Sequence, residues 1–300
     1  MSKYIQISLM LVLLCCSACQ DPVDADELLN VDDGTYIIGY LSPTDTVLTV
    51  HVSTAVPAVG TPIYDHVDDM GYGSNTDPFI IKDATVHISD EDDNEIQLIY
   101  NPESRNYQVD ASEFDIKGEA TYFLRVSVNN EEFTSSCTIP KKIEPITEKI
   151  TAGEKNEFYQ DYNLDIAFQD ISGSKNYYII GAIAEETHEG ETYPYTIDFE
   201  LSSFLTDVIG DGETLSANSI ITNYDVENST TVKITLQVAN VEETLYLNRR
   251  ATYLNDYNDG NPFVEYSIMP NNIEGKNGVG VFAGYQLTEK VIEYELNGNP

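Results

Sequence analysis

Residues 46–54, TVLTVHVST, decide the fold class of this chain. Leu48, Val50 and Val52 alternate along the stretch with smaller or more polar side chains, among them His51. Because successive side chains of a β-strand point to opposite faces of the sheet, this alternation predicts a strand with one face in a core and the other in solvent. Residues 83–90, DATVHISD, repeat the pattern with His87 on the outer face. We therefore expect a mainly β chain.

Similar short segments follow one another from residue 34 to residue 140. The candidate strands are 35–41, 46–54, 84–89, 96–100, 106–110, 121–128 and 131–139. Asn129 and Asn130 separate the last two strands, and asparagine tolerates the positive φ angles of a two-residue hairpin turn. Seven or so short strands without a convincing helix predict an immunoglobulin-like β-sandwich over 34–140. The chain has no tryptophan, so it lacks the Cys–Trp–Cys core of antibody domains.

The charged segment 141–149 is predicted to be a linker to a second β-rich domain over 150–300. Residues 177–187 and 193–201 predict a hairpin, and residues 230–240 predict a further strand. Residues 241–258 are the best helix candidate, because Leu245 and Asn248 recur at helical spacing on one face and Leu247, Ala251 and Leu254 on another. We expect at most one or two short helices in this half.

The N-terminus has the features of a lipoprotein signal peptide over residues 1–18. Lys3 precedes the apolar run 5–14, whose ten residues would span only about 15 Å as a helix, too short to cross a bilayer. The run ends in CSAC, residues 16–19, which resembles a lipobox with Cys19 as the acylated residue, although Cys16 stands where leucine is usual. The alternative is an ordinary secreted protein cleaved nearby. With residues 1–18 removed, Cys137 is the other remaining cysteine and is expected to be a small buried side chain.

Acidic residues dominate the composition and the segment after Cys19. Residues 19–33 are predicted to be a flexible acidic tether. The whole chain carries 51 acidic and 15 basic residues, a formal net charge of −36. Such a chain repels phosphate backbones, so we do not expect nucleic acid or anionic lipid as partners. Cations, cationic peptides and basic protein surfaces remain open, and the charge also serves solubility.

No motif of an enzyme stands out in the sequence. The chain has four histidines, and it lacks a Gly-x-Ser-x-Gly elbow, an HExxH pair, a paired CxxC and a phosphate-binding glycine loop. Carboxylate pairs are uninformative in so acidic a chain. We therefore expect no catalytic residues and no enzyme activity.

Two segments are candidate binding loops. The long irregular stretch 55–78 lies between predicted strands, and long loops on rigid sandwiches are often functional. A second segment, 188–198, would present two tyrosines on one side of an extended strand. The candidate binding residues are Tyr64, Asp65, His66, Asp68, Asp69, Tyr72, Tyr193 and Tyr195. Exposed loops without a binding role are the alternative.

Part of the first loop is also a candidate metal site. Asp65, His66, Asp68 and Asp69 supply carboxylate and imidazole groups that suit a divalent cation. Residues 90–95, DEDDNE, and 255–262, NDYNDGNP, are weaker candidates, since Asp, Asn and Gly favour solvated turns in any case. We otherwise expect no cofactor.

The mature chain as a whole resembles the DUF4249 family of lipoproteins from Bacteroidota. The resemblance rests on the lipobox and acidic tether and on three stretches: 81–100, 118–146 and 261–285, the last reading NPFVEYSIMPNNIEGKNGVGVFAGY. It covers most of the chain and matches scaffold rather than a catalytic signature. It implies a β-rich protein anchored in the outer membrane and often associated with TonB-dependent transporters.

By this resemblance the chain would be a surface-exposed lipoprotein. Its expected partners are membrane lipid, through acylated Cys19, and a TonB-dependent outer-membrane barrel, which it would serve as a non-enzymatic accessory or binding subunit. A structural or adhesive cell-surface β-sandwich protein is the alternative, and a metal-capture protein acting alone is a third reading. The sequence does not identify the ligand.

Overall fold

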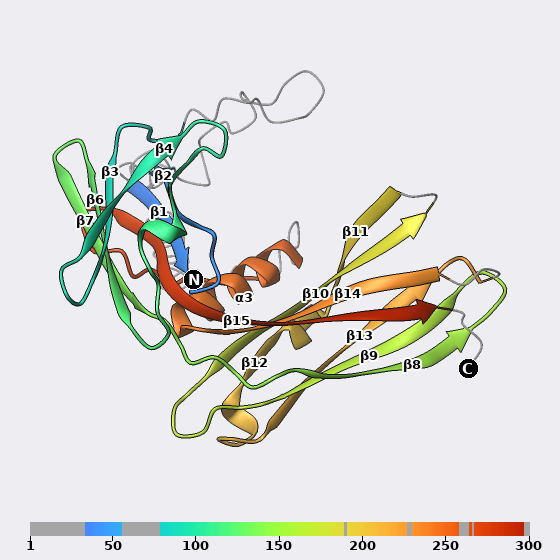
Figure 1. Cartoon of the computed structure of the whole chain (residues 1–300). Helices are drawn as coiled ribbons and strands as arrows, with labels where there is room; N and C mark the ends of the chain where they lie inside the picture. Colours follow the sequence, from blue (N-terminus) through green and yellow to red (C-terminus); the bar gives the residue numbers. More distant parts are fainter. Residues whose placement is uncertain are drawn as a thin grey trace, which may run out of the picture.

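The computed structural model describes residues 34–55, 79–188, 191–226, 230–257, 264–265 and 267–296. Within these ranges the chain forms fifteen β-strands and a single α-helix, arranged as two β-rich units side by side (Figure 1). The prediction of a mainly β chain is confirmed.

The first unit has two layers that enclose a hydrophobic core. One layer contains β1 (Gly34–Leu41), β2 (Val47–Ala55), β5 (Asn106–Asp110) and the beginning of β15 (Gly278–Leu296); the other contains β3 (Thr85–Asp90), β6 (Thr121–Val128) and β7 (Glu131–Thr138). Strand β4 (Glu95–Asn101) passes from one layer to the other, because Leu98 pairs with Val86 of β3 and Ile99 pairs with Gln108 of β5. All these strands therefore belong to one continuous hydrogen-bonded sheet.

The alternation in the sequence determines which side chains fill this core. Leu48, Val50 and Val52 of β2 are fully buried and pack in the same cluster as Ile88 of β3, as the pattern predicted. Cys137 on β7 points into the cluster and is 2% exposed, which confirms its expected burial. Burial raises the pKa of its thiol.

The second unit is also built from two facing layers. One contains β10 (Tyr177–His188), β11 (Glu191–Ile197), β12 (Phe204–Thr206), β14 (Thr230–Val241) and the end of β15; the other is a separate three-stranded sheet of β8 (Thr147–Lys155), β9 (Gln160–Gln169) and β13 (Thr214–Asn223). Leu164 and Ile166 of β9 pack against Ile234 and Leu236 of β14 between the layers. The predicted hairpin is confirmed, since β10 and β11 pair antiparallel from Ala182 to His188.

Strand β15 belongs to both units. Its first residues, 278–284, pair in parallel with β1, and its remaining residues, 285–296, pair antiparallel with β14. Close approach to β1 requires glycine at position 280, where a Cβ atom would lie 1.8 Å from the Ile37 carbonyl oxygen and φ is +136°. A segment assigned from sequence to the second domain thus completes the sheet of the first unit.

Helix α3 (Glu243–Tyr257) covers the junction between the units (Figure 1). Leu245 and Tyr246 pack in one buried cluster with Val281 and Ala283 of β15. The predicted helix over 241–258 is therefore confirmed. Of its two predicted faces, the one with Leu245 and Asn248 is buried, whereas the other is divided, with Ala251 buried and Leu247 exposed.

Glu242, directly before the helix, joins three segments at the junction. Its carboxylate accepts hydrogen bonds from the backbone N–H groups of Thr138 at 2.8 Å and Gly284 at 2.7 Å. Burial raises the pKa of this carboxyl group, partly offset by the two hydrogen bonds. The end of β7 and the middle of β15 are thus held at fixed positions beside α3.

Candidate functional site: a polar groove on the first unit

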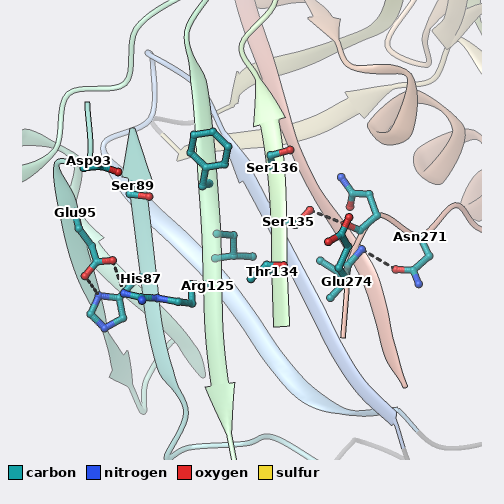
Figure 2. Close-up of a pocket in the computed structure, with 14 residues that line it drawn as sticks. His87, Ser89, Asp93, Glu95, Arg125, Thr134, Ser135, Ser136, Asn271 and Glu274 are labelled. Atoms are coloured by element: carbon teal, nitrogen blue, oxygen red, sulfur yellow. Dashed lines mark hydrogen bonds and ion pairs between the residues drawn. The ribbon is translucent and has the colours of Figure 1, made fainter. Parts of the chain in front are cut away.

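A groove of about 700 Å³ lies on the outer face of β3, β6 and β7. Its floor consists of the side chains that point away from the core on these strands. One row across the sheet runs through Ser89, Phe123 and Ser136, which are paired in register. A second row runs through His87, Arg125 and Thr134 (Figure 2). The floor therefore consists of every second residue of each strand, the residues whose side chains face away from the core.

Charged side chains line one side of the groove. Glu95 of β4 accepts from Arg125 Nη2 at 2.5 Å, and its other carboxylate oxygen lies 2.9 Å from His87 Nδ1 (Figure 2). All three side chains are partly exposed, so solvent screens this network and its contribution to stability is small. Its main effect is to orient the three side chains along the groove and to neutralise the charge of Arg125 locally.

Residues 271–274 form the opposite wall. Glu274 forms two backbone hydrogen bonds with Thr134 of β7, at 2.9 and 2.8 Å, so the segment extends the sheet by one short rung. The side chains of Asn271 and Asn272 hydrogen-bond to backbone groups of β15, including both the N–H and the C=O of Phe282. These amides are therefore structural, and they hold the wall in place.

The groove presents hydroxyl, charged and aromatic groups that suit recognition of a bound molecule. Histidine oriented by a carboxylate is half of a nucleophile–base–acid arrangement. The other half is a hydroxyl within hydrogen-bond reach of the imidazole, and among the described contacts no serine or threonine hydroxyl bonds to His87. The hydroxyls of Ser89, Thr134 and Ser136 are instead spread along two strand rows, where they can serve as hydrogen-bond donors and acceptors for a bound molecule.

The structure describes two of the eight sequence-predicted binding residues, Tyr193 and Tyr195. Tyr64, Asp65, His66, Asp68, Asp69 and Tyr72 fall outside the described residues, as does the lipidation site Cys19. The binding and metal hypotheses for the loop 55–78 therefore stay predictions.

Tyr193 and Tyr195 lie on β11, the edge strand of the second unit. Both side chains are on the same face, 51% and 36% exposed, and each hydroxyl donates to a carboxylate, Glu191 and Glu186 respectively. Burial raises the pKa of Tyr195, and the bond to Glu186 adds to this effect. The two tyrosines point the same way, as expected for an extended strand, and the groove is not near them in the fold.

The weaker metal candidate at 90–95 is a turn in which the Asp90 carboxylate already accepts hydrogen bonds from groups of the same turn. One carboxylate oxygen of Asp90 accepts from the backbone N–H groups of Asp92 and Asn94, and the other accepts from the Asn94 side chain. No group of three or more His, Cys, Asp or Glu side chains with metal-binding geometry occurs in the described ranges.

The groove was not predicted, although the sequence contains one signal for it. Phe123 occupies an outward position in β6, between the buried Tyr122 and Leu124, and its ring is 44% exposed. An aromatic residue at a position of a strand that should face solvent indicates a surface available for binding. The wall could not be foreseen, because residues 271–274 reach β7 only through the pairing of β15 with β1.

The described part of the chain has one α-helix, α3. This helix is neither long enough nor apolar enough to span a membrane.

Comparison with known proteins gives one family and little more. No curated protein matches the chain. Among solved structures, the chain is similar to one described as "Biofilm associated protein - BSP domain", at 8% identity and a TM-score of 0.18, with 85% of this chain and 58% of that chain covered. This chain thus spans less than two thirds of that structure's length, and a likeness of this size supports no conclusion. The family model described as "Domain of unknown function (DUF4249)" matches residues 20–291. The chain belongs to the DUF4249 family.

Proposed function

We propose that this protein is a lipid-anchored, non-enzymatic binding or accessory subunit of a TonB-dependent transport system, held at the outer membrane and facing the cell exterior. The proposed partners are membrane lipid, through acylated Cys19, and the transport barrel. No resident cofactor is part of the proposal.

The observation that carries the binding role is the groove on the outer face of β3, β6 and β7. It combines an exposed aromatic ring with hydroxyl and charged groups on a paired sheet, the usual composition of a recognition surface. The sheet is fixed on both sides, by Glu242 at the end of β7 and by the wall segment 271–274. A rigid site of this kind binds with little ordering cost.

The proposed location rests on the N-terminal sequence. A short apolar run, the CSAC stretch ending at Cys19 and the acidic segment 20–33 together suit a lipid anchor followed by a spacer. Membership of the DUF4249 family supports the same reading, through the resemblance to Bacteroidota lipoproteins described above.

The test is a pull-down of the full chain from native outer membranes in mild detergent, followed by mass spectrometry. We expect stoichiometric recovery of a large TonB-dependent barrel. A Cys19→Ala variant is the control: it should lose incorporation of radiolabelled palmitate and leave the membrane fraction.

Recovery of the protein alone, under conditions that preserve other barrel complexes, would contradict the transport role. Polymers of the chain on the cell surface would establish the structural or adhesive alternative instead. Palmitate labelling of the Cys19→Ala variant would show that the anchor has been placed at the wrong residue.

A further inference from the structure

The centre of the groove is an exposed phenylalanine with small neighbours. Phe123 is paired across the sheet with Ser89 on one side and Ser136 on the other. Serine side chains are too short to cover the ring, so both flanks of Phe123 stay open to a bound molecule. An apolar or aromatic group placed there would bury surface that the protein itself leaves in water.

The free charges of the groove are negative. Arg125 and His87 both face Glu95. Asp93, in the turn between β3 and β4, and Glu274, on the opposite wall, have no ion pair among the described residues (Figure 2). The formal net charge of the whole chain is −36, which adds a long-range attraction for cations and a repulsion of anions.

The spacing of these groups sets the length of the ligand. Counted across the strands alone, from β3 through β6 and β7 to the wall, Asp93 and Glu274 are three strand spacings apart, or about 14 Å. Four residues of extended polypeptide span about the same distance. The hydroxyls of Ser89, Thr134 and Ser136 lie along this path and can bond to the amides of an extended backbone.

We propose that the groove binds an extended segment of a partner protein in which an aromatic side chain stands between two lysine or arginine residues four positions apart. The aromatic side chain packs on Phe123, and the two cationic side chains pair with Asp93 and Glu274. This inference rests on the proposed binding role and names the kind of partner that the groove fits. It does not depend on the partner being a transporter.

The test measures binding of a fluorescein-labelled peptide, GKSFSKG, to the full chain in mild detergent by fluorescence anisotropy. Two comparison peptides replace the phenylalanine with alanine or both lysines with glutamate. We expect the first change to weaken binding about tenfold, the value of one buried aromatic contact, and the second to abolish it.

Matched protein variants show whether the groove is the binding site. Phe123→Ala should weaken binding about tenfold, whereas Phe158→Ala, at an exposed phenylalanine in the turn between β8 and β9, should leave it unchanged. Glu274→Gln and Asp93→Asn should each weaken binding several-fold and reduce its dependence on salt, and Glu154→Gln on β8 should do neither. Circular dichroism checks that every variant is folded.

Several outcomes would overturn the inference. These are equal losses for Phe123→Ala and Phe158→Ala, equal binding of the alanine peptide, which would mean non-specific charge attraction, and no binding to folded protein. The result is independent of the membrane pull-down. Peptide binding without a recovered barrel would leave the groove assignment standing and remove the transport role, and a recovered barrel without peptide binding would do the reverse.

Discussion

Gly280 lies where β15 makes its closest approach to β1. A Cβ atom at this position would lie 1.8 Å from the carbonyl oxygen of Ile37, and the φ of +136° is strained for any other residue. We expect Gly280→Ala to lower the free energy of unfolding by at least about 3 kcal/mol, measured by urea denaturation.

Gly173→Ala separates the two causes of this loss. Gly173 also has positive φ, +91°, and its Cβ would meet nothing within 4 Å. This variant should cost about 1–2 kcal/mol, the conformational part alone. Equal costs for the two variants would mean that β15 does not pack against β1 as closely as described.

Asp90 closes the turn between β3 and β4 and provides a pH-dependent test. Hydrogen bonds from the Asn94 side chain, and from the backbone N–H groups of Asn94 and Asp92, lower the pKa of its carboxyl group below the ordinary value of 3.8. A lowered pKa means that the ionised form stabilises the fold. This stabilisation is present above the ordinary value and is lost as the pH falls through the lowered pKa.

Asp90→Ala should therefore lower the thermal midpoint at neutral pH, and its difference from the unmodified chain should shrink in acid. Asp92→Ala is the control in the same turn, because only the backbone of Asp92 takes part in the bonding. A difference that persists below the lowered pKa would point to packing, and not to the carboxylate, as its cause.

For single residues, the sequence predicts the properties that depend on near neighbours in the chain, such as turn conformation and burial. Asn129 and Asn130 adopt φ of 48° and 66°, as their place in a hairpin turn predicts. The burial of Cys137 follows from strand alternation in the same way. Phe123 also follows the alternation. Its ring is open to a bound molecule, however, because its neighbours Ser89 and Ser136 are small, and these lie on other strands.

Among the elements, β11 is an edge strand that is open to unwanted pairing. It ends the twelve-stranded sheet, and Pro194 lies in its middle, opposite Glu185. Proline lacks an N–H group, and in strands it occupies edges where that group would face solvent. Pro194 thus removes one donor from the free edge and protects it against another strand.

We expect Pro194→Val to increase self-association of the chain, measured by light scattering over a concentration series. Thr192→Val changes the same strand, raises its β propensity and keeps the backbone N–H, so it should behave like the unmodified chain. If both variants associate equally, hydrophobicity and not the restored donor is responsible.

Helix α3 shows how far periodicity predicts an element. The spacing of Leu245 and Asn248 predicted a helix and one of its faces correctly. The same reasoning gave Leu247 and Ala251 a second face, of which the fold buries Ala251 and leaves Leu247 exposed. A helical period identifies the helix, whereas the choice of buried face depends on β15 and β10, which occupy one side of it.

For the whole molecule, the shared strand β15 makes the first unit depend on a segment that also belongs to the second. The core of the first unit includes Ile273 and Phe282, which come from the end of the chain. We expect residues 34–140 expressed alone to remain unfolded by near-ultraviolet circular dichroism, and a peptide of residues 271–284 to restore the signal when added or fused.

The same peptide with Gly280→Val is the control and should not restore it. Cooperative unfolding of residues 34–140 without the peptide would contradict this dependence. It would also support the division of the chain into 34–140 and 150–300 that the sequence suggests.

The order of the strands could not be predicted from the sequence, because it depends on pairing between segments far apart in the chain. Period two identifies a strand and its inward face, but it carries no information on a partner far along the chain. The pairing of β1 with β15 is set by the complementary shape at Gly280 and by the cluster under α3, and both exist only once the ends of the chain have met.

The position of β15 also has a consequence for the order of events during biosynthesis. Asp45 and Tyr285, whose side chains are hydrogen-bonded at 2.5 Å, stand 240 positions apart in the chain. Topologies dominated by such distant contacts fold slowly, because the loop must close before the contacts form. The first unit therefore cannot complete its sheet before β15 has been synthesised. For the exported protein proposed above, such a delay would keep the chain unfolded, and able to pass through a translocation channel, until β15 has been made.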